Sequence, residues 1–195
     1  EDVDPTSMER ELRRAQEGEI SFDAEAYVNR IPVKRHDHLL IPAGTVHCSG
    51  ADTLVLEISA TPSVFTFKLW DWGRVDLDGN PRPIHLEHGL RNIQWDRTQS
   101  WVEENLLHQE IQCGKQDGVL VERTGLHRLE FIDTFRLTLQ KPFVCVMDDG
   151  VHVLNLVDGE KAMIESPAGE FEPVEIHYAE TFIIPAAVKT YRVVP

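Results

Sequence analysis

The sequence contains no long hydrophobic run and few basic residues. Its longest uninterrupted apolar stretch, Phe143–Met147, has five residues, whereas a membrane-spanning helix needs about 18–20. Lysine and arginine number 19 against 33 aspartates and glutamates, which gives a formal net charge of −14. Such an acidic chain is poorly suited to neutralise the phosphates of nucleic acid or an anionic membrane surface. We therefore expect neither a membrane span nor a nucleic-acid partner.

Cysteine is scarce as well, and it shows no pairing pattern. Cys48, Cys113 and Cys145 lie far apart, without CxxC spacing or the even number of a disulfide framework. This usage is typical of a reducing compartment, so we expect a cytoplasmic protein. Methionine is missing before position 8. We expect the chain to be a portion of a longer protein, part of whose functional machinery lies upstream of Glu1.

The first thirty residues have a helical pattern. Asp4 followed by Pro5 suits the N-cap and first position of a helix. The apolar residues that follow fall on one helical face: Met8, Leu12 and Ala15. A second short helix is expected over 23–28. We expect this helical segment, residues 1–30, to pack its apolar face on another part of the protein.

Most of the remaining chain has the pattern of short strands separated by turns. Helices are expected only over 84–93 and 98–107. Strands are expected over 38–41, 54–59, 64–71, 109–113, 118–123, 129–133, 135–139, 143–147, 151–157, 160–165, 172–176, 181–184 and 190–194. Many short strands at regular spacing are typical of a sandwich, a jelly roll or a barrel. With 195 residues, of which 42% are hydrophobic, the chain suffices for one globular domain or two small ones.

An internal repeat links the two halves of the chain. Residues 37–44 (DHLLIPAG) and 180–187 (ETFIIPAA) share the pattern acid, any residue, two apolar residues, Ile, Pro, Ala and a small residue. His47 is the third residue after the first copy, and Thr190 occupies that position after the second. We infer that one fold is used twice, with a possible metal ligand in the first copy only.

The segment Pro42-Ala43-Gly44-Thr45-Val46-His47 resembles the second cupin motif, PxGxxH. In that motif a turn directs a histidine into a small β-barrel, where its neutral imidazole ligates a divalent metal ion. A histidine in a β-protein is otherwise commonly an ordinary hydrogen-bonded residue. The motif therefore offers His47 as a candidate ligand beside that structural alternative.

Two longer stretches, IPAGTVHCSGADTLVLEIS and FTFKLWDWGRVDLDGNPRPIHLEHGL, resemble class I mannose-6-phosphate isomerases of the bacterial, zinc-dependent cupin type. The resemblance runs from Val33 to Ile93 and resumes more weakly over Leu129–Val194. It implies a mainly β fold built from cupin-type double-stranded β-helices (jelly rolls), with a few short helices. The chain would be the C-terminal portion of such an enzyme.

The same resemblance implies a domain order. Residues 1–30 would be the tail of a helical insertion, and 31–74 the C-terminal part of the metal-bearing first barrel. Residues 75–125 would be a helical, linking segment. Residues 126–195 would form a smaller, degenerate C-terminal jelly roll without a metal site. Its core is expected to contain Phe131, Phe135 and Phe182, and His152 would be a single leftover histidine there.

The resemblance also implies an activity and its residues. Such enzymes interconvert mannose 6-phosphate and fructose 6-phosphate with one zinc ion in each full-length chain. His47 would be a zinc ligand, and Glu57 an acidic residue lining the pocket. Lys68 stands where the family usually has an arginine, and Arg74 matches a second cation. Isomerisation through an enediolate needs a base for the proton and positive charge for the oxygen, which suits these residue types.

Several alternatives remain open at this point. The alternative for Glu57 is an ordinary ion pair with a cation on a solvated face. The remaining zinc ligands are expected upstream of Glu1, on a portion of the protein against which this chain would pack, and His36 and His38 are interpreted as surface residues. Trp70 and Trp72 either line a sugar pocket or pack in a core. The second functional hypothesis is a non-catalytic cupin module that binds a sugar or regulates a partner, and the third is another metal-dependent cupin enzyme such as an oxygenase.

Overall fold

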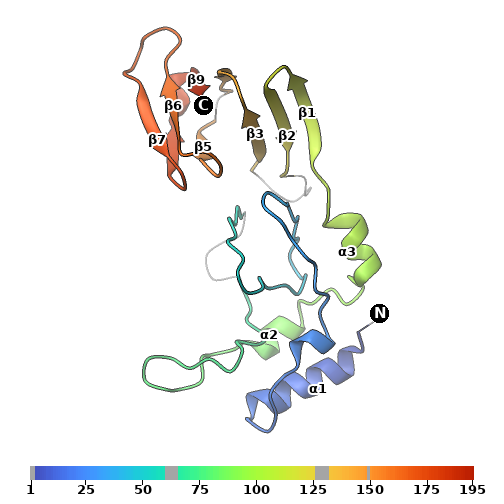
Figure 1. Ribbon diagram of the computed structural model, residues 1–195. Helices are drawn as coiled ribbons and strands as arrows, with labels where there is room; N and C mark the ends of the chain where they lie inside the picture. The colour runs from blue at the N-terminus through green and yellow to red at the C-terminus, as the bar shows by residue number, and fades with distance from the viewer. Residues whose placement is uncertain (1–2, 60–65, 126–131, 149) are drawn as a thin grey trace. The chain divides into compact units, whose positions relative to one another are not determined.

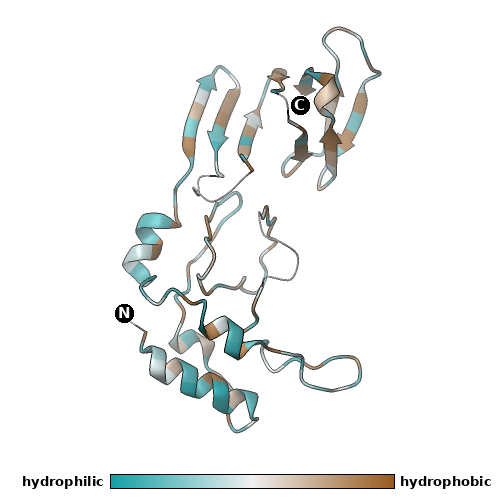
Figure 2. Ribbon diagram, turned by 180° about the vertical axis from the view of Figure 1, so that it is seen from behind, coloured by the Kyte–Doolittle hydropathy of each residue, from teal (hydrophilic) through white to brown (hydrophobic). Residues whose placement is uncertain are grey.

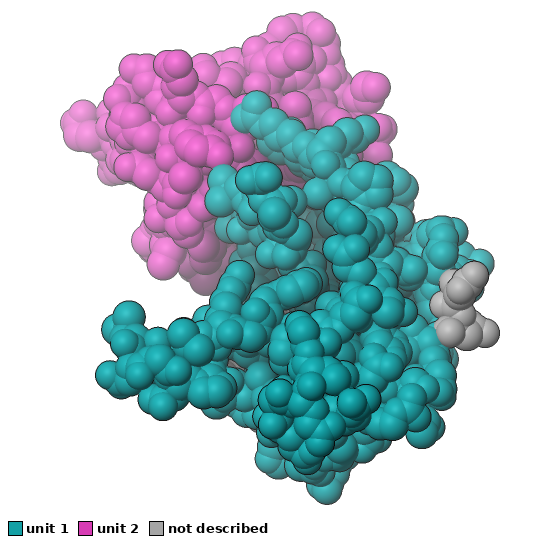
Figure 3. Space-filling view, turned by 60° about the horizontal axis from the view of Figure 1, so that its bottom comes forward, with its two compact units in different colours: residues 1–110, 124–134 teal, residues 111–123, 135–195 magenta. Residues whose placement is uncertain are grey.

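The protein is mainly β, with a few short helices, and it divides into two compact units. The computed structural model describes residues 3–59, 66–125, 132–148 and 150–195. Unit 1 comprises residues 1–110 and 124–134, and unit 2 comprises residues 111–123 and 135–195 (Figure 3). Among the described residues, no helix combines the length and the apolar character that crossing a membrane requires.

The N-terminal helix of unit 1 forms as predicted. Helix α1 (Pro5–Gln16) begins at Asp4, whose side chain accepts hydrogen bonds from the backbone N–H groups of Thr6 and Ser7, both at 3.2 Å. These bonds satisfy donors that have no partner within the helix. The second helix expected over 23–28 is reduced to the single 3₁₀ turn η1 (Ala24–Ala26).

Two further helices complete unit 1 and are shorter than predicted. They are α2 (Leu86–Leu90) and α3 (Gln99–Asn105). Helices α1 and α2 lie side by side (Figure 1). The apolar face of α1 is buried in the core of this unit, whose buried members are Met8, Leu12, Ala15, Phe22 and Leu86. Trp70 packs against this core at its edge, with its ring 6.0 Å from that of Phe22.

The strands expected over 38–41 and 54–59 do not form, so these two predictions are wrong. Their apolar and β-branched residues favour an extended chain, and among the described residues their pairing consists of one bridge between Leu39 and Leu107. In the second segment, residues of both faces are exposed, from Leu54 to Ile58. A strand is defined by hydrogen bonds to a neighbour, which local sequence cannot supply. The prediction over 64–71 lies partly outside the described residues, and 66–71 forms no strand.

Unit 2 consists of antiparallel strands in three sheets. Their bounds are β1 (Ile111–Gln116), β2 (Val119–Arg123), β3 (Phe135–Leu139), β4 (Phe143–Val146), β5 (His152–Asn155), β6 (Lys161–Glu165), β7 (Val174–His177), β8 (Thr181–Ile184) and β9 (Thr190–Val194). The sheets have the orders β1-β2-β3, β4-β9-β6-β7 and β5-β8. The 3₁₀ turn η2 (Ala186–Val188) joins β8 to β9.

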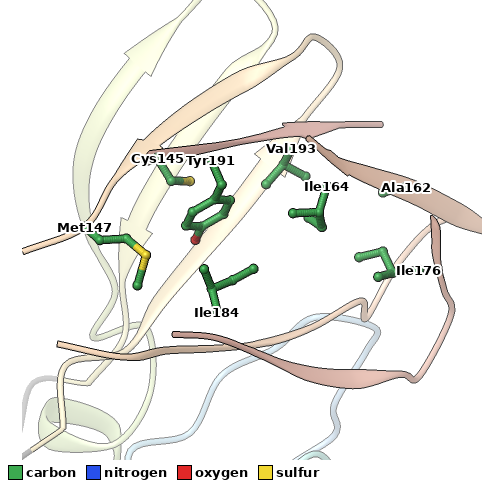
Figure 4. Close-up of a cluster of buried hydrophobic side chains, with 8 residues drawn as sticks. All are labelled: Cys145, Met147, Ala162, Ile164, Ile176, Ile184, Tyr191 and Val193. Carbon is green, nitrogen blue, oxygen red and sulfur yellow. The ribbon is translucent and has the colours of Figure 1, made fainter. Parts of the chain in front are cut away.

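The core of unit 2 follows from alternation along the strands. Hydrophobic and hydrophilic residues alternate along several of them (Figure 2). In β9, Tyr191 and Val193 point inward, and Ala162 and Ile164 do the same in the neighbouring β6. Figure 4 shows Tyr191 in the middle of the buried cluster, beside Cys145, Met147 and Ile184. Side chains two residues apart share a face, so two such strands present one continuous apolar surface.

The predicted core of unit 2 is only partly correct. Phe182 is half-buried against the core, as predicted, whereas Phe135 is about half exposed, which corrects its assignment. Phe131 lies outside the described residues, and so does most of the strand expected over 129–133. Strands β1 and β2 belong to unit 2, although they were expected within the linking segment 75–125. The jelly-roll arrangement and the assignment of 31–74 to a cupin barrel stay predictions.

Candidate functional site

The proline turn that precedes His47 is a closed local structure. The carbonyl oxygen of Pro42 accepts hydrogen bonds from the Thr45 backbone N–H at 3.3 Å and from Thr45 Oγ1 at 2.8 Å. Gly44 has φ of 86°, in the left-handed region, and a Cβ there would lie 2.7 Å from the carbonyl oxygen of Asn92. Glycine is therefore required by both conformation and space.

Arg97 holds this turn from a distant part of the chain. Its guanidinium donates to the carbonyl oxygens of Pro42 at 3.1 Å and Ala43 at 2.7 Å, and to Thr45 Oγ1. The same group lies over the ring of Trp101, 4.8 Å from its centroid. Partial burial lowers the pKa of Arg97, but guanidinium stays charged in proteins. Sequence analysis missed Arg97, because nothing in its local pattern connects it to a motif some fifty residues away.

His47 itself is exposed, and its ring orientation is fixed by one hydrogen bond. Nδ1 lies 2.9 Å from the carbonyl oxygen of Thr45. Because a carbonyl can only accept, Nδ1 carries the proton and the other ring nitrogen, Nε2, remains available as a lone-pair donor. Metal-binding histidines are commonly oriented in this way. His36 is exposed, as predicted, and His38 is half-buried.

The described residues do not by themselves make a zinc site. Zinc takes at least three protein ligands. Within residues 3–59, 66–125, 132–148 and 150–195, no group of three or more histidine, cysteine, aspartate or glutamate side chains could hold a metal ion. His47 has the geometry of a single ligand. We therefore assign no chemical step to a metal on the basis of these residues.

A second constellation of unit 1 gathers cations around one carboxylate, Asp71. Its Oδ2 lies 3.0 Å from Lys68 Nζ and 3.1 Å from Arg82 Nε, and its Oδ1 lies 3.8 Å from Arg74 Nη1. The Asp71 side chain is 11% exposed, against 34% for Lys68, 64% for Arg74 and 43% for Arg82. The anion is thus the shielded centre, and the cations lie toward solvent. We call these four residues the cation cluster.

Tight turns bring the cation cluster together. The Arg74 backbone N–H donates to the Asp71 carbonyl at 2.9 Å, across a turn in which Trp72 and Gly73 have φ of 56° and 65°. The Arg82 N–H then donates to the Arg74 carbonyl at 3.2 Å. Between these two arginines the chain projects as an exposed loop (Figure 1). Residues far apart in this loop are therefore neighbours at its base.

Helix α2 fixes the other side of the cluster. The His85 N–H donates to the Lys68 carbonyl at 2.7 Å, and the Lys68 N–H donates to His85 Nδ1 at 3.2 Å. Gly89 allows close approach, since a Cβ there would lie 2.5 Å from Leu69 Cδ2. His85, the residue that precedes α2, thus helps to hold the backbone of Lys68 in place.

The electrostatics of the cluster combine an ionised carboxylate with an excess of positive charge. The Lys68 ammonium, as hydrogen-bond donor, lowers the pKa of Asp71, and the charges of Arg82, Lys68 and Arg74 lower it further against the opposing effect of burial. Asp71 is therefore ionised at neutral pH. Three cations and one carboxylate leave two positive charges uncompensated within the cluster, on a protein whose net charge is −14.

The structure joins some of the predicted site residues and separates others. Lys68 and Arg74 meet at Asp71, whereas Glu57 lies exposed on the extended segment 54–59 and is not part of the cluster. Asp71 and Arg82 were missed. Their signal was present as the acid between two tryptophans and the arginine after a Gly-Asn-Pro turn. Trp70 packs on the core, the simpler of its two interpretations, and Trp72 is exposed.

His152 in unit 2 has a structural partner. Its Nδ1 lies 2.9 Å from the hydroxyl oxygen of Tyr191, which links β5 to β9. Burial, together with the neighbouring Cys145, raises the pKa of Tyr191, so the hydroxyl stays protonated. Cys145 is a buried free thiol, and Cys48 and Cys113 are exposed free thiols. The pair thus gives the half-buried His152 a hydrogen-bond partner within unit 2.

Proteins named mannose-6-phosphate isomerase are similar to this chain in sequence. Mannose-6-phosphate isomerase ManA of Bacillus subtilis (strain 168) is 26% identical over 155 residues, covering 74% of this chain and 48% of ManA. The putative mannose-6-phosphate isomerase YvyI of the same strain is 31% identical over 87 residues, covering 44% and 27%. The mannose-6-phosphate isomerase of Streptococcus mutans serotype c is 31% identical over 68 residues, covering 35% and 21%. The chain thus spans about half the length of ManA, and less of the other two.

The structural comparison agrees with the sequence comparison at the level of the fold. The crystal structure of mannose 6-phosphate isomerase from Bacillus subtilis has a TM-score of 0.52 with this chain at 12% identity, covering 66% of this chain and 37% of that one. No protein-family model matches. The expected likeness to proteins named mannose-6-phosphate isomerase and the mainly β fold are confirmed, and the enzyme class, the zinc site and the cupin details stay predictions.

Proposed function

We propose that this chain is part of an aldose–ketose isomerase that converts mannose 6-phosphate to fructose 6-phosphate. The observation that carries the proposal is the cation cluster, in a chain whose relatives are named for that reaction. The substrate class, a phosphosugar, fits a surface with uncompensated positive charge on an otherwise acidic protein. The proposal places the protein in the cytoplasm.

The chemistry assigns roles to individual residues. Isomerisation moves a proton between C1 and C2 of the open-chain sugar, and negative charge develops on the oxygen of the enediolate. Arg74 and Lys68 are proposed either to stabilise such an oxyanion or to hold the phosphate dianion of the substrate, and Arg74 is the most exposed cation of the cluster. Glu57 is the carboxylate proposed to carry the proton, which requires that segment 54–59 be brought to the substrate.

His47 is proposed as one ligand of the zinc ion. Its Nδ1–H bond to Thr45 leaves Nε2 as the ligating atom, and Arg97 fixes the turn that directs the ring. The remaining ligands are proposed to lie upstream of Glu1. That portion of the protein would also supply a strand partner for the exposed segment 54–59 and complete the first barrel, against which this chain packs.

One observation favours a second candidate function. Trp72 is a large exposed aromatic residue within the turn that carries the cluster. Exposed aromatic rings offer an apolar face for a ligand. A non-catalytic cupin module that binds a sugar would use the same surface without turnover.

A coupled assay with mannose 6-phosphate and added zinc tests the proposal, run on the full-length gene product and on this chain. We expect turnover in the full-length protein. Arg74→Ala should lower kcat/KM at least about tenfold there, because it removes a positive charge that stabilises the oxyanion or holds the phosphate. Arg91→Ala, an exposed arginine outside the cluster, is the matched control and should leave kcat/KM unchanged.

The outcomes separate the two candidates. Equal kinetics for Arg74→Ala and the parent protein would remove Arg74 from the mechanism. Absence of turnover in the full-length protein, together with measurable sugar binding, would favour the non-catalytic module. Zinc content addresses the ligand assignment separately: His47→Ala should lower it, and a full metal complement in that variant would contradict the assignment.

A further inference from the structure

We infer that Lys68, Arg74 and Arg82 form a binding site for a phosphoryl dianion, and that Asp71 is the positioning residue that holds the three cations in place. The inference rests on the proposed function in one respect, which is that the phosphoryl group belongs to the sugar substrate. Arg82 is the new member of the site. Arg82 joins the site because the loop between Arg74 and Arg82 brings its side chain back to Asp71.

The first argument is the arrangement around the carboxylate. Lys68 Nζ and Arg82 Nε share Oδ2 of Asp71, at 3.0 and 3.1 Å, and Arg74 approaches Oδ1 at 3.8 Å. All three cations are more exposed than the carboxylate that they surround. The shielded Asp71 carboxylate sets the positions of the three cations, while their solvent-facing sides remain accessible to a ligand.

The second argument is charge. One carboxylate neutralises one of three cations, so like charges are held together with an excess of two. Holding like charges so close is unfavourable, and a dianion in front of them removes that repulsion. Guanidinium groups bind phosphoryl oxygens through paired, charge-assisted hydrogen bonds, and an ammonium adds a compact point charge. Two arginines and a lysine suit this ligand better than a monoanion.

The third argument is the backbone that carries the cluster. Trp72, a bulky residue, has φ of 56°, a left-handed conformation that is unfavourable for such a side chain. Strained backbone of this kind persists where the surrounding structure enforces it, and it concentrates at binding sites. Here it allows the chain to reverse at once, so that Arg74 returns toward Asp71. Two hydrogen bonds between Lys68 and His85 secure the opposite side.

The competing explanation is that the cluster only ties the loop to unit 1 through ion pairs. Exposed ion pairs contribute little to stability, about 0–1 kcal/mol each, and that explanation assigns no ligand. The two explanations differ in one measurable respect. A structural cluster has no affinity for phosphate beyond that of any basic surface, whereas a binding site loses its affinity when a single member is removed.

The test is isothermal titration of this chain with inorganic phosphate at constant ionic strength, with sulfate as a comparison ion. Arg82→Gln removes one cation and keeps a hydrogen-bonding side chain, and Arg91→Gln is the matched control on an exposed arginine outside the cluster. We expect Arg82→Gln to weaken phosphate binding about tenfold or more and Arg91→Gln to leave it unchanged. Equal affinity in the parent and in Arg82→Gln, equal weakening by both variants, or no binding by the parent would each overturn the inference.

The role of Asp71 needs its own variants. Asp71→Asn keeps the shape and removes the charge that attracts the cations, so phosphate affinity should fall although the net positive charge rises by one. Asp71→Glu restores the carboxylate and should recover part of the affinity. An increase in affinity for Asp71→Asn would show that the carboxylate merely opposes the anion, and it would overturn the positioning role. If Asp71→Asn does not fold, as judged by tryptophan fluorescence, Arg82→Gln still decides the site.

The same variants separate this inference from the proposed function. In the full-length protein, Arg82→Gln should raise KM for mannose 6-phosphate and change kcat less, since it removes a binding contact. Unchanged KM with normal turnover would overturn the inference and leave the isomerase proposal standing. Phosphate binding that depends on Arg82, without any isomerase turnover, would overturn the proposed function and leave the site.

Discussion

The two copies of the internal repeat have nearly the same sequence pattern and different structures. In the second copy, residues 181–184 form β8, which pairs with β5 at four successive positions. In the first copy, the pairing of residues 38–41 with the described part of the chain is the bridge from Leu39 to Leu107. Ile184 is 6% exposed, whereas its counterpart Ile41 is 40% exposed. The same apolar, β-branched pattern is therefore a strand where a partner is present and an extended segment where none of the described residues supplies one.

The proline turns of the two copies, in contrast, share one hydrogen bond. The Thr45 N–H donates to the Pro42 carbonyl at 3.3 Å, and the Val188 N–H donates to the Pro185 carbonyl at 3.0 Å. Each bond joins residues three positions apart, so the turn needs no partner from elsewhere. The local conformations nevertheless differ, because Gly44 is left-handed whereas Ala187 lies in the 3₁₀ turn η2, and the long-range pairing differs as well.

The largest expected effect comes from truncating the buried isoleucine of the second copy. Ile184→Ala should lower the free energy of unfolding of unit 2 by about 2–5 kcal/mol, because it leaves a cavity in a packed core. Ile41→Ala, at the matched position, should change stability by less than about 1 kcal/mol. Circular dichroism during urea unfolding measures the β structure of unit 2. Equal losses for both variants would show that the first copy is packed as tightly as the second.

The next largest effect is expected from exchanging the last, small residue of the two copies, Gly44 and Ala187. Gly44→Ala gives the first copy the alanine that the second has at this position, and it should destabilise unit 1 by about 1–3 kcal/mol, because φ is positive and the new Cβ meets the Asn92 carbonyl. The reverse change, Ala187→Gly, should cost about 0.5–1 kcal/mol through chain entropy alone. All four tryptophans lie in unit 1, so their fluorescence during urea unfolding measures the first variant. A neutral Gly44→Ala would contradict the close approach to Asn92.

A smaller effect is expected at Cys48 and Tyr191. These residues follow His47 in the first copy and Thr190 in the second. Tyr191→Phe removes the buried hydroxyl that is hydrogen-bonded to His152 and should cost about 1 kcal/mol, since the half-buried ring nitrogen loses its partner. Cys48→Ala, at the matched exposed position, should stay within about 0.5 kcal/mol of the parent. Urea unfolding followed by circular dichroism compares the two. Equal free energies of unfolding for Tyr191→Phe and the parent protein would mean that water replaces the hydroxyl.

The smallest effect is a pH dependence confined to unit 1. The pKa of Asp71 is lowered in the folded protein, first by its hydrogen bond from Lys68. Its contribution to stability is therefore complete above the unfolded pKa of about 3.9 and is lost as pH falls through the folded value. Asp71→Asn should make the acid unfolding curve of unit 1, followed by tryptophan fluorescence below pH ~4, shallower than that of the parent. Parallel curves would show that Asp71 does not carry this dependence.

Local sequence determined those elements whose hydrogen bonds close within a few residues. Helix α1, its Asp4 cap and its buried face were predicted correctly, because capping and helical periodicity are local. Strands β3, β8 and β9 have the predicted bounds, since their alternation is strong and each has a neighbour to pair with. The likeness to proteins named mannose-6-phosphate isomerase was also readable from continuous motifs.

Only the tertiary structure decided which extended segments became strands and which cations meet. Segment 54–59 has the residues of a strand but depends on a partner that its own sequence cannot provide. The cation cluster joins Lys68 and Arg74 to Arg82 through the Asp71 carboxylate and the loop between the two arginines. Arg97 likewise binds a proline turn that lies far from it along the chain. Ion pairs and strand pairing are interactions between residues distant along the chain, so composition and spacing name the candidates, and packing selects among them.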